Sequence, residues 1–180
     1  MSDPSVRPVQ GGDIPAITRI YADAVRHGTA TFEIEPPDEA EMTRRRQALL
    51  AAGFPYIVAE LDGAVAGYAY AGAYHSRPAY RWTVENSIYV AAQFQRQGLG
   101  GRLLARLITE SQARGFRQMI ALIGDSTNAA SIALHKAAGF GLIGTLRSVG
   151  FKRGRWLDVV VMQRALGEGD ATPPRASGLA

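Results

Sequence analysis

Apolar residues recur along the chain with two different periods, and these periods predict alternating strands and helices. The helical spacing of Ile14, Ile17, Tyr21 and Val25 predicts a first helix that ends near Gly28. Asp62-Gly63 between two apolar runs predicts a β-hairpin. The expected strands are residues 5–9, 56–61, 64–73, 82–90, 118–124, 142–149 and 156–166, and helices are expected after residue 13, over 39–52, after residue 101 and over 126–138.

Length and composition fit one α/β domain with a single hydrophobic core. The chain has 180 residues, of which 47% are hydrophobic. We expect the domain to cover residues 1–166, and we expect residues 167–180, rich in Gly, Pro and Ala without periodicity, to form a disordered tail. No signal peptide and no apolar run of membrane-spanning length are found, which predicts a cytoplasmic protein without a membrane partner.

The distribution of charge and of reactive residues argues against several classes of function. The net charge is +4, but the basic residues are dispersed and form no nucleic-acid-binding motif, while a modest positive balance suits a polyanionic cofactor. Cysteine is absent, which excludes a cysteine thioester and a thiolate metal site. The three histidines have no ligand spacing, so we expect no metal centre.

The stretch from Trp82 to Arg114 joins a strand, a glycine-rich loop and a helix with apolar residues on one face. Glycines let an anion approach the backbone, and the first turn of a helix offers free N–H groups and the positive end of its dipole. Gly98, Gly100 and Gly101 lack the following Lys of a P-loop, and Leu103 stands where a dinucleotide fingerprint needs glycine. A phosphate site and a simple turn both remain as interpretations.

The pattern Gln-x-x-Gly-x-Gly, at Gln95, Gly98 and Gly100, resembles the pyrophosphate loop of the GNAT superfamily of N-acetyltransferases. Together with the segment 128–140 and the order of elements, it makes most of the chain similar to that superfamily. Residues 82–90 (WTVENSIYV) and 150–158 (GFKRGRWLD) resemble its phosphinothricin and methionine sulfoximine acetyltransferase branch. Some members have a histidine where Arg153 stands, so the resemblance carries no role to Arg153.

The resemblance implies a fold, a cofactor and a set of contacts. The fold would be a mixed sheet of about seven strands, splayed at its centre and flanked by about four helices. Acetyl-CoA would be the acetyl donor, and the protein would be a homodimer. The implied acetyl-CoA-binding residues are Ile88, Tyr89 and Val90 through their backbone, Arg96, Gln97, Gly98, Leu99, Gly100 and Gly101 around the pyrophosphate, and Asn128, Ser131 and His135 along the pantetheine arm.

Glu85 is the candidate general base for acetyl transfer to an amine. A carboxylate inside a strand loses solvation, and a raised pKa would suit a base that works near neutral pH, directly or through a water. The alternative is a glutamate on the solvent face of an edge strand. The loop before this strand carries Arg77 and Arg81, which are candidates to bind the carboxylate or phosphinate of a small amino-acid analogue, or are solvated loop arginines.

Two aromatic residues have open roles. Phe32 could fill the core or form a wall of the substrate pocket, as the resemblance implies, and we expect Trp156 in the core, with a dimer or pocket role as the alternative. The resulting hypothesis is an acetyl-CoA-dependent N-acetyltransferase for the α-amino group of a small amino-acid analogue. Alternatives are an acetyltransferase for another small amine or a protein N-terminus, and a non-catalytic acyl-CoA sensor.

Overall fold

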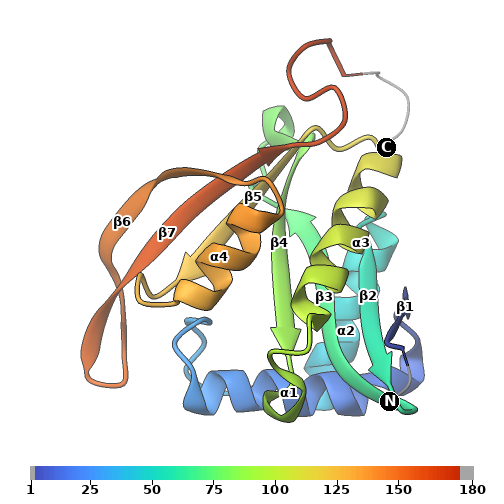
Figure 1. Ribbon diagram of the computed structural model, residues 1–180, viewed down its shortest axis with the longest axis vertical. Coiled ribbons are helices and arrows are strands. Elements are labelled where there is room, and N and C mark those ends of the chain that lie inside the picture. The colour runs from blue at the N-terminus through green and yellow to red at the C-terminus, as the bar shows by residue number, and fades with distance from the viewer. Residues whose placement is uncertain (1–2, 175–180) are drawn as a thin grey trace.

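A seven-stranded mixed sheet forms the centre of the protein, whose computed structural model describes residues 3–174 (Figure 1). The strands lie in the order β1-β2-β3-β4-β5-β7-β6. All neighbours are antiparallel except β4 and β5, which are parallel. The strands are β1 (Ser5–Pro8), β2 (Tyr56–Leu61), β3 (Ala64–Ala73), β4 (Thr83–Val90), β5 (Gln118–Gly124), β6 (Gly141–Lys152) and β7 (Arg155–Ala165).

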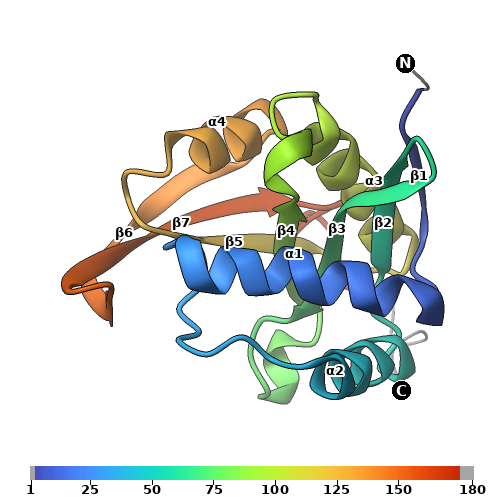
Figure 2. The same cartoon turned by 90° about the horizontal axis from the view of Figure 1, so that it is seen from below.

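Two pairs of helices cover opposite faces of the sheet (Figure 2). Helices α1 (Ile14–His27) and α2 (Glu39–Ala51) pack on one face, where a core cluster includes Tyr56, Tyr68 and Ile17. Helices α3 (Leu99–Ala113) and α4 (Ala129–Ala137) pack on the other face, where α3 buries one apolar side against β2 to β5. Short 3₁₀ turns at Gly11–Asp13, Pro78–Tyr80 and Ala92–Phe94 complete the chain. The expected fold is confirmed.

The sheet opens between β4 and β5. These strands pair over only three positions, from Thr83 opposite Gln118 to Glu85 opposite Ile120. On its other side, β4 stays paired with β3 as far as Val90. The second half of β4 therefore has a free backbone edge inside the sheet.

The β6–β7 hairpin extends further than its sequence indicated. Pairing continues to Lys152 opposite Arg155, so β6 ends three residues beyond the expected Val149. The turn is made by Arg153 and Gly154, both with positive φ, as a tight two-residue hairpin requires. Figure 1 shows this hairpin projecting beyond the helices.

The chain after β7 is described as far as residue 174, while the expected disorder of residues 167–180 stays a prediction. Arg117, the residue before β5, donates hydrogen bonds to the carbonyl oxygens of Thr172 (3.2 Å) and Pro173 (3.1 Å) in this segment. The rest of the expected tail, residues 175–180, lies outside the described residues. Within residues 3–174, no helix combines the length and apolar character that crossing a membrane requires.

Candidate active site

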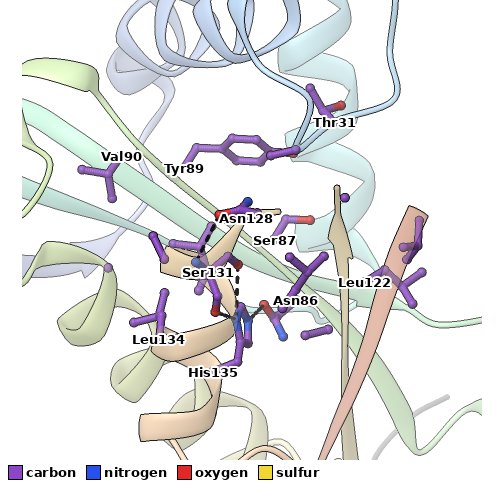
Figure 3. Close-up of a pocket in the computed structure, with 18 of the residues that line it drawn as sticks. Thr31, Asn86, Ser87, Tyr89, Val90, Leu122, Asn128, Ser131, Leu134 and His135 are labelled. Atoms are coloured by element: carbon purple, nitrogen blue, oxygen red, sulfur yellow. Dashed lines mark hydrogen bonds between the residues drawn. The ribbon is translucent and has the colours of Figure 1, made fainter. Parts of the chain in front are cut away.

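A cavity of about 860 Å³ occupies the opening between β4 and β5 (Figure 3). Its walls come from segments far apart in sequence: the second half of β4, the end of β5, the start of α3, one side of α4 and the loop after α1. The cavity thus passes through the sheet, from the face that carries α3 and α4 to the face that carries α1. The residues that line it from the predicted set are Phe32, Glu85, Ile88, Tyr89, Val90, Arg96, Gly98, Gly100, Gly101, Asn128, Ser131 and His135.

The first turn of α3 forms one end of the cavity. Gly98 precedes the helix with φ of +80°, a left-handed conformation that costs glycine little. The helix then begins Leu99-Gly100-Gly101-Arg102, without an acidic residue to offset its positive end. Leu99 itself is buried in the core, so its side chain anchors the helix and only its backbone is available. Gln97 is exposed beside the cavity and donates to the carbonyl oxygen of Gln93 (3.4 Å).

The backbone of β4 is unpaired along the cavity at alternate residues. Ala91 donates its N–H to the carbonyl oxygen of Ala66 in β3. Because backbone groups alternate sides along a strand, the N–H groups of Ile88 and Val90 point the other way, into the opening. The backbone N–H group of Tyr89 points toward β3. Tyr89 is the middle one of the three residues whose backbone was expected at the pantetheine arm. Because its backbone faces β3, it lines the cavity with its side chain, whose ring packs edge-on against Tyr21 with the ring centroids 5.1 Å apart.

Glu85 lies at the closed end of the opening, in the last residue pair that joins β4 to β5. Its side chain is half-buried, and burial raises the pKa of its carboxyl group above the ordinary value. No residue within 3–174 donates a hydrogen bond to the carboxylate, so nothing in the described chain offsets this shift. The structure thus excludes the solvent-face interpretation of Glu85, while its role as a base remains a prediction.

Helix α4 presents three predicted residues to the cavity (Figure 3). The side chain of Asn128 caps the helix by accepting from the N–H of Ser131 (3.2 Å). His135, one turn later, is buried, with its Nδ1 2.8 Å from the carbonyl oxygen of Ser131. Its Nε2 lies 3.0 Å from Oδ1 of Asn86. Burial lowers the pKa of His135, which favours the neutral ring at pH 7.

The loop after α1 closes the cavity on the α1 face. Phe32 lines the cavity instead of filling the core, and it rests on Gly150 of β6, where a Cβ would come within 2.2 Å of the ring. The buried Lys152 donates to the carbonyl oxygen of Thr31 (2.9 Å), and the hydroxyl groups of Thr31 and Tyr21 lie 3.0 Å apart. The hairpin β6–β7 therefore holds this loop in place.

The two candidate arginines lie outside the cavity lining. Arg77 and Arg81 flank an exposed 3₁₀ turn before β4, and the guanidinium of Arg81 stacks over Trp82 at 5.3 Å. Neither forms an ion pair with another residue of the described chain. Trp156 was expected in the core, and this prediction is wrong. The side chain is 63% exposed because β6–β7 is an edge hairpin whose outer face is uncovered.

Sequence reasoning missed the contribution of Asn86 and Ser87, which line the cavity beside Glu85. The available signal was a run of three polar residues, Glu85-Asn86-Ser87, inside a strand. It also missed the end of β5, from Ala121 to Gly124, because an apolar run carries no sign that its strand edge is free. The described residues bring no group of three His, Cys, Asp or Glu side chains together that could hold a metal ion.

Comparisons with known proteins agree on one family. Residues 16–140 match the model of the acetyltransferase (GNAT) family. Phosphinothricin N-acetyltransferase of Alcaligenes faecalis is 54% identical over 94% of this chain and 86% of its own length. The L-methionine sulfoximine/L-methionine sulfone acetyltransferase of Salmonella typhimurium is 41% identical over 91% of this chain and 95% of its own. Among solved structures, a phosphinothricin acetyltransferase from Sinorhizobium meliloti in complex with acetyl-CoA superposes with a TM-score of 0.95, at 47% identity over 97% of this chain and 95% of that one.

Proposed function

Because the chain belongs to the acetyltransferase (GNAT) family, we propose that it transfers the acetyl group of acetyl-CoA to the α-amino group of a small amino-acid analogue. Phosphinothricin, methionine sulfoximine and methionine sulfone are the substrate types, as the names of the relatives suggest. One observation carries the proposal: a single opening through the sheet leads from the start of α3 to the carboxylate of Glu85.

The cofactor would enter from the α3 face. Its pyrophosphate fits the first turn of α3, where free N–H groups and an uncompensated dipole favour an anion, and Arg96 lines the same end. The pantetheine arm carries amide groups, and the free N–H groups of Ile88 and Val90 offer them the pairing that β5 does not supply. The N–H of Val90 is also the candidate donor for the thioester oxygen during attack.

The amine would be activated by Glu85. An α-ammonium group gives one proton to the carboxylate, directly or through a water, and the neutral nitrogen then attacks the thioester carbon. Collapse of the intermediate would break the C–S bond; the nitrogen would lose one more proton to become the amide, the thiolate of CoA would gain one, and no acyl-enzyme would be needed in this ternary complex. Arg77 and Arg81 remain candidates for a carboxylate or phosphinate, provided that the substrate extends beyond the cavity lining toward the start of β4.

A thiol-release assay over a panel of amines tests the proposed function. The panel contains phosphinothricin, methionine sulfoximine, methionine sulfone, a polyamine and a peptide with a free N-terminus. We expect acetyl-CoA-dependent release with the amino-acid analogues. Release only with the peptide or the polyamine would favour another amine substrate, and tight acetyl-CoA binding without any release would favour the sensor.

A negative charge in the first turn of α3 is expected to weaken acetyl-CoA binding without unfolding the protein. Gly101→Asp places a carboxylate at the third helical position, where a Cβ meets nothing within 4 Å and where the helix dipole favours an acid. The same carboxylate repels the pyrophosphate, so we expect the KM for acetyl-CoA to rise about tenfold. Gly101→Asn, of equal size but uncharged, is the matched control, and equal effects of both variants would contradict an anion site.

We also propose that the outer face of the β6–β7 hairpin contacts a second copy of the chain. This face exposes large apolar side chains, among them Leu142 (66%), Phe151 (58%) and Trp156 (63%), more than a monomer usually leaves in water. Leu142→Asp is therefore expected to convert a dimer of twice 19.3 kDa into a monomer, as measured by light scattering. Leu50→Asp, on the exposed side of α2, should leave the mass unchanged.

A further inference from the structure

The place where β4 and β5 separate is fixed by one side chain. The parallel pairing stops at Glu85 and Ile120, and the next residue, Asn86, turns its side chain toward the α4 face. Its Nδ2 donates a hydrogen bond to the backbone carbonyl oxygen of Ile120 at 3.1 Å. A side-chain amide thus continues the contact between the strands for one more step after the backbone ladder ends. Asn86 is buried, with 7% of its surface exposed.

The same side chain also reaches helix α4. Oδ1 of Asn86 lies 3.0 Å from Nε2 of His135, and the ring of His135 packs edge-on against Phe140 at 5.0 Å. The other ring nitrogen faces the carbonyl oxygen of Ser131, one turn earlier in α4. Asn86 therefore joins three elements, β4, β5 and α4, around the closed end of the opening (Figure 3).

The hydrogen-bonding groups fix the direction of both side-chain bonds of Asn86. The carbonyl of Ile120 can only accept, so the amide nitrogen of Asn86 must face it and Oδ1 must face the histidine. Nε2 of His135 must then carry a proton. Nδ1 lies 2.8 Å from the carbonyl oxygen of Ser131, which also can only accept, so a proton on Nδ1 makes that bond and a ring with protons on both nitrogens makes both bonds at once. Both ring nitrogens thus face oxygen acceptors of the protein.

We propose that Asn86 is a positioning residue for acetyl-CoA: it sets the width of the opening by tying β5 to β4 and by holding α4 across from them. The inference rests on the proposed function, because the pantetheine arm is the group that would lie in this opening. The position of α4 determines where Asn128 and Ser131 lie. The separation of β4 from β5 determines how much room is left beside Ile88 and Val90. All four line the cavity.

Asn86→Ala is expected to raise the Kd for acetyl-CoA about tenfold while the KM for the amine stays within twofold, since two buried polar partners lose their bonds. Gln118→Ala is the matched control. It removes the acceptor of a side-chain hydrogen bond from Gln163 of β7 (2.9 Å), and Gln118 lies in β5 at the end that pairs with β4, outside the cavity lining. We expect it to leave the Kd unchanged. An unchanged Kd for Asn86→Ala, or equal losses in the two variants, would overturn the proposal.

A measurement on the unaltered protein keeps the inference testable if Asn86→Ala folds poorly. Long-range ¹H–¹⁵N spectra of histidine rings report which nitrogen carries the proton. We expect Nε2 of His135 to carry a proton, because it faces Oδ1 of Asn86. A ring protonated on Nδ1 alone would mean that Asn86 does not accept from it, and the proposal would be wrong. Failure of the unaltered protein to bind acetyl-CoA would instead reject the proposed function.

Discussion

Glu85→Gln is expected to lower kcat by about 10²–10⁴-fold, the range in which a general base contributes. The substitution keeps the size of the side chain and removes its ability to accept a proton from the amine. The carboxylate has no hydrogen-bond donor within residues 3–174, so the change breaks no structural bond there, and the Kd for acetyl-CoA should stay within twofold. Steady-state kinetics with saturating acetyl-CoA, together with calorimetric titration of the cofactor, measure both quantities.

The pH dependence provides the control for this result. The carboxylate is the active form, so the rate should fall as the pH falls through the pKa of Glu85. Burial raises this pKa, so the acidic limb should lie above the ordinary glutamate range. Glu85→Gln should lack the limb. Glu60→Gln, at a partly exposed strand carboxylate paired with Arg7 away from the cavity, should keep both the limb and the rate. An unchanged kcat for Glu85→Gln would remove this residue from the mechanism.

Gly124→Ala is expected to destabilise the protein by about 1–3 kcal/mol and to raise the KM for the amine. Gly124 ends β5 beneath the loop that follows α1. A Cβ there would lie 2.8 Å from the carbonyl oxygen of Ala30 and 2.9 Å from that of Thr29. These are backbone atoms, so the loop itself must move. The hydrogen bond from Thr29 to the buried carboxylate of Asp125 (2.8 Å) would be strained with it.

Thermal unfolding and amine kinetics test the effect of Gly124→Ala. A loss of this size should lower Tm by roughly 2–4 °C for each kcal/mol in a chain of this length. Gly144→Ala is the matched control, because Gly144 lies in β6 and a Cβ there meets nothing within 4 Å. If both variants behave alike, the loop does not depend on its contact with β5. A loss of stability without any change in the amine KM would remove the loop from the substrate site.

Much of this architecture was predictable because its signals are local. Helical periodicity predicted α1, and Asp62-Gly63 predicted the hairpin between β2 and β3. The glycines before α3 predicted an anion site, and the cavity reaches these glycines. Glu85 could be selected because a carboxylate inside a strand is unusual. Each of these inferences needs only neighbouring residues, and the structure bears out their placement.

The remaining features depend on partners that are distant in sequence. The contacts of Asn86 require Ile120 and His135, and their approach follows from the register of β4 with β5. The position of Arg81 shows the reverse relation. It lies four residues before Glu85, but a strand rises about 3.3 Å per residue, so closeness in sequence becomes separation in space. The exposure of Trp156 depends on which strands lie at the edge of the sheet, and the sequence alone does not give the strand order.

The single parallel joint in the sheet has a topological consequence. Two antiparallel strands can be joined by a short turn, but two parallel neighbours need a crossover that returns the chain to the other end. In this chain the crossover from β4 to β5 is α3. The connection that makes β4 and β5 parallel therefore also delivers the start of a helix to the end of β4, beside the opening. The crossover through α3 therefore produces both the seam between the two antiparallel halves of the sheet and the position of the proposed anion site at the start of α3.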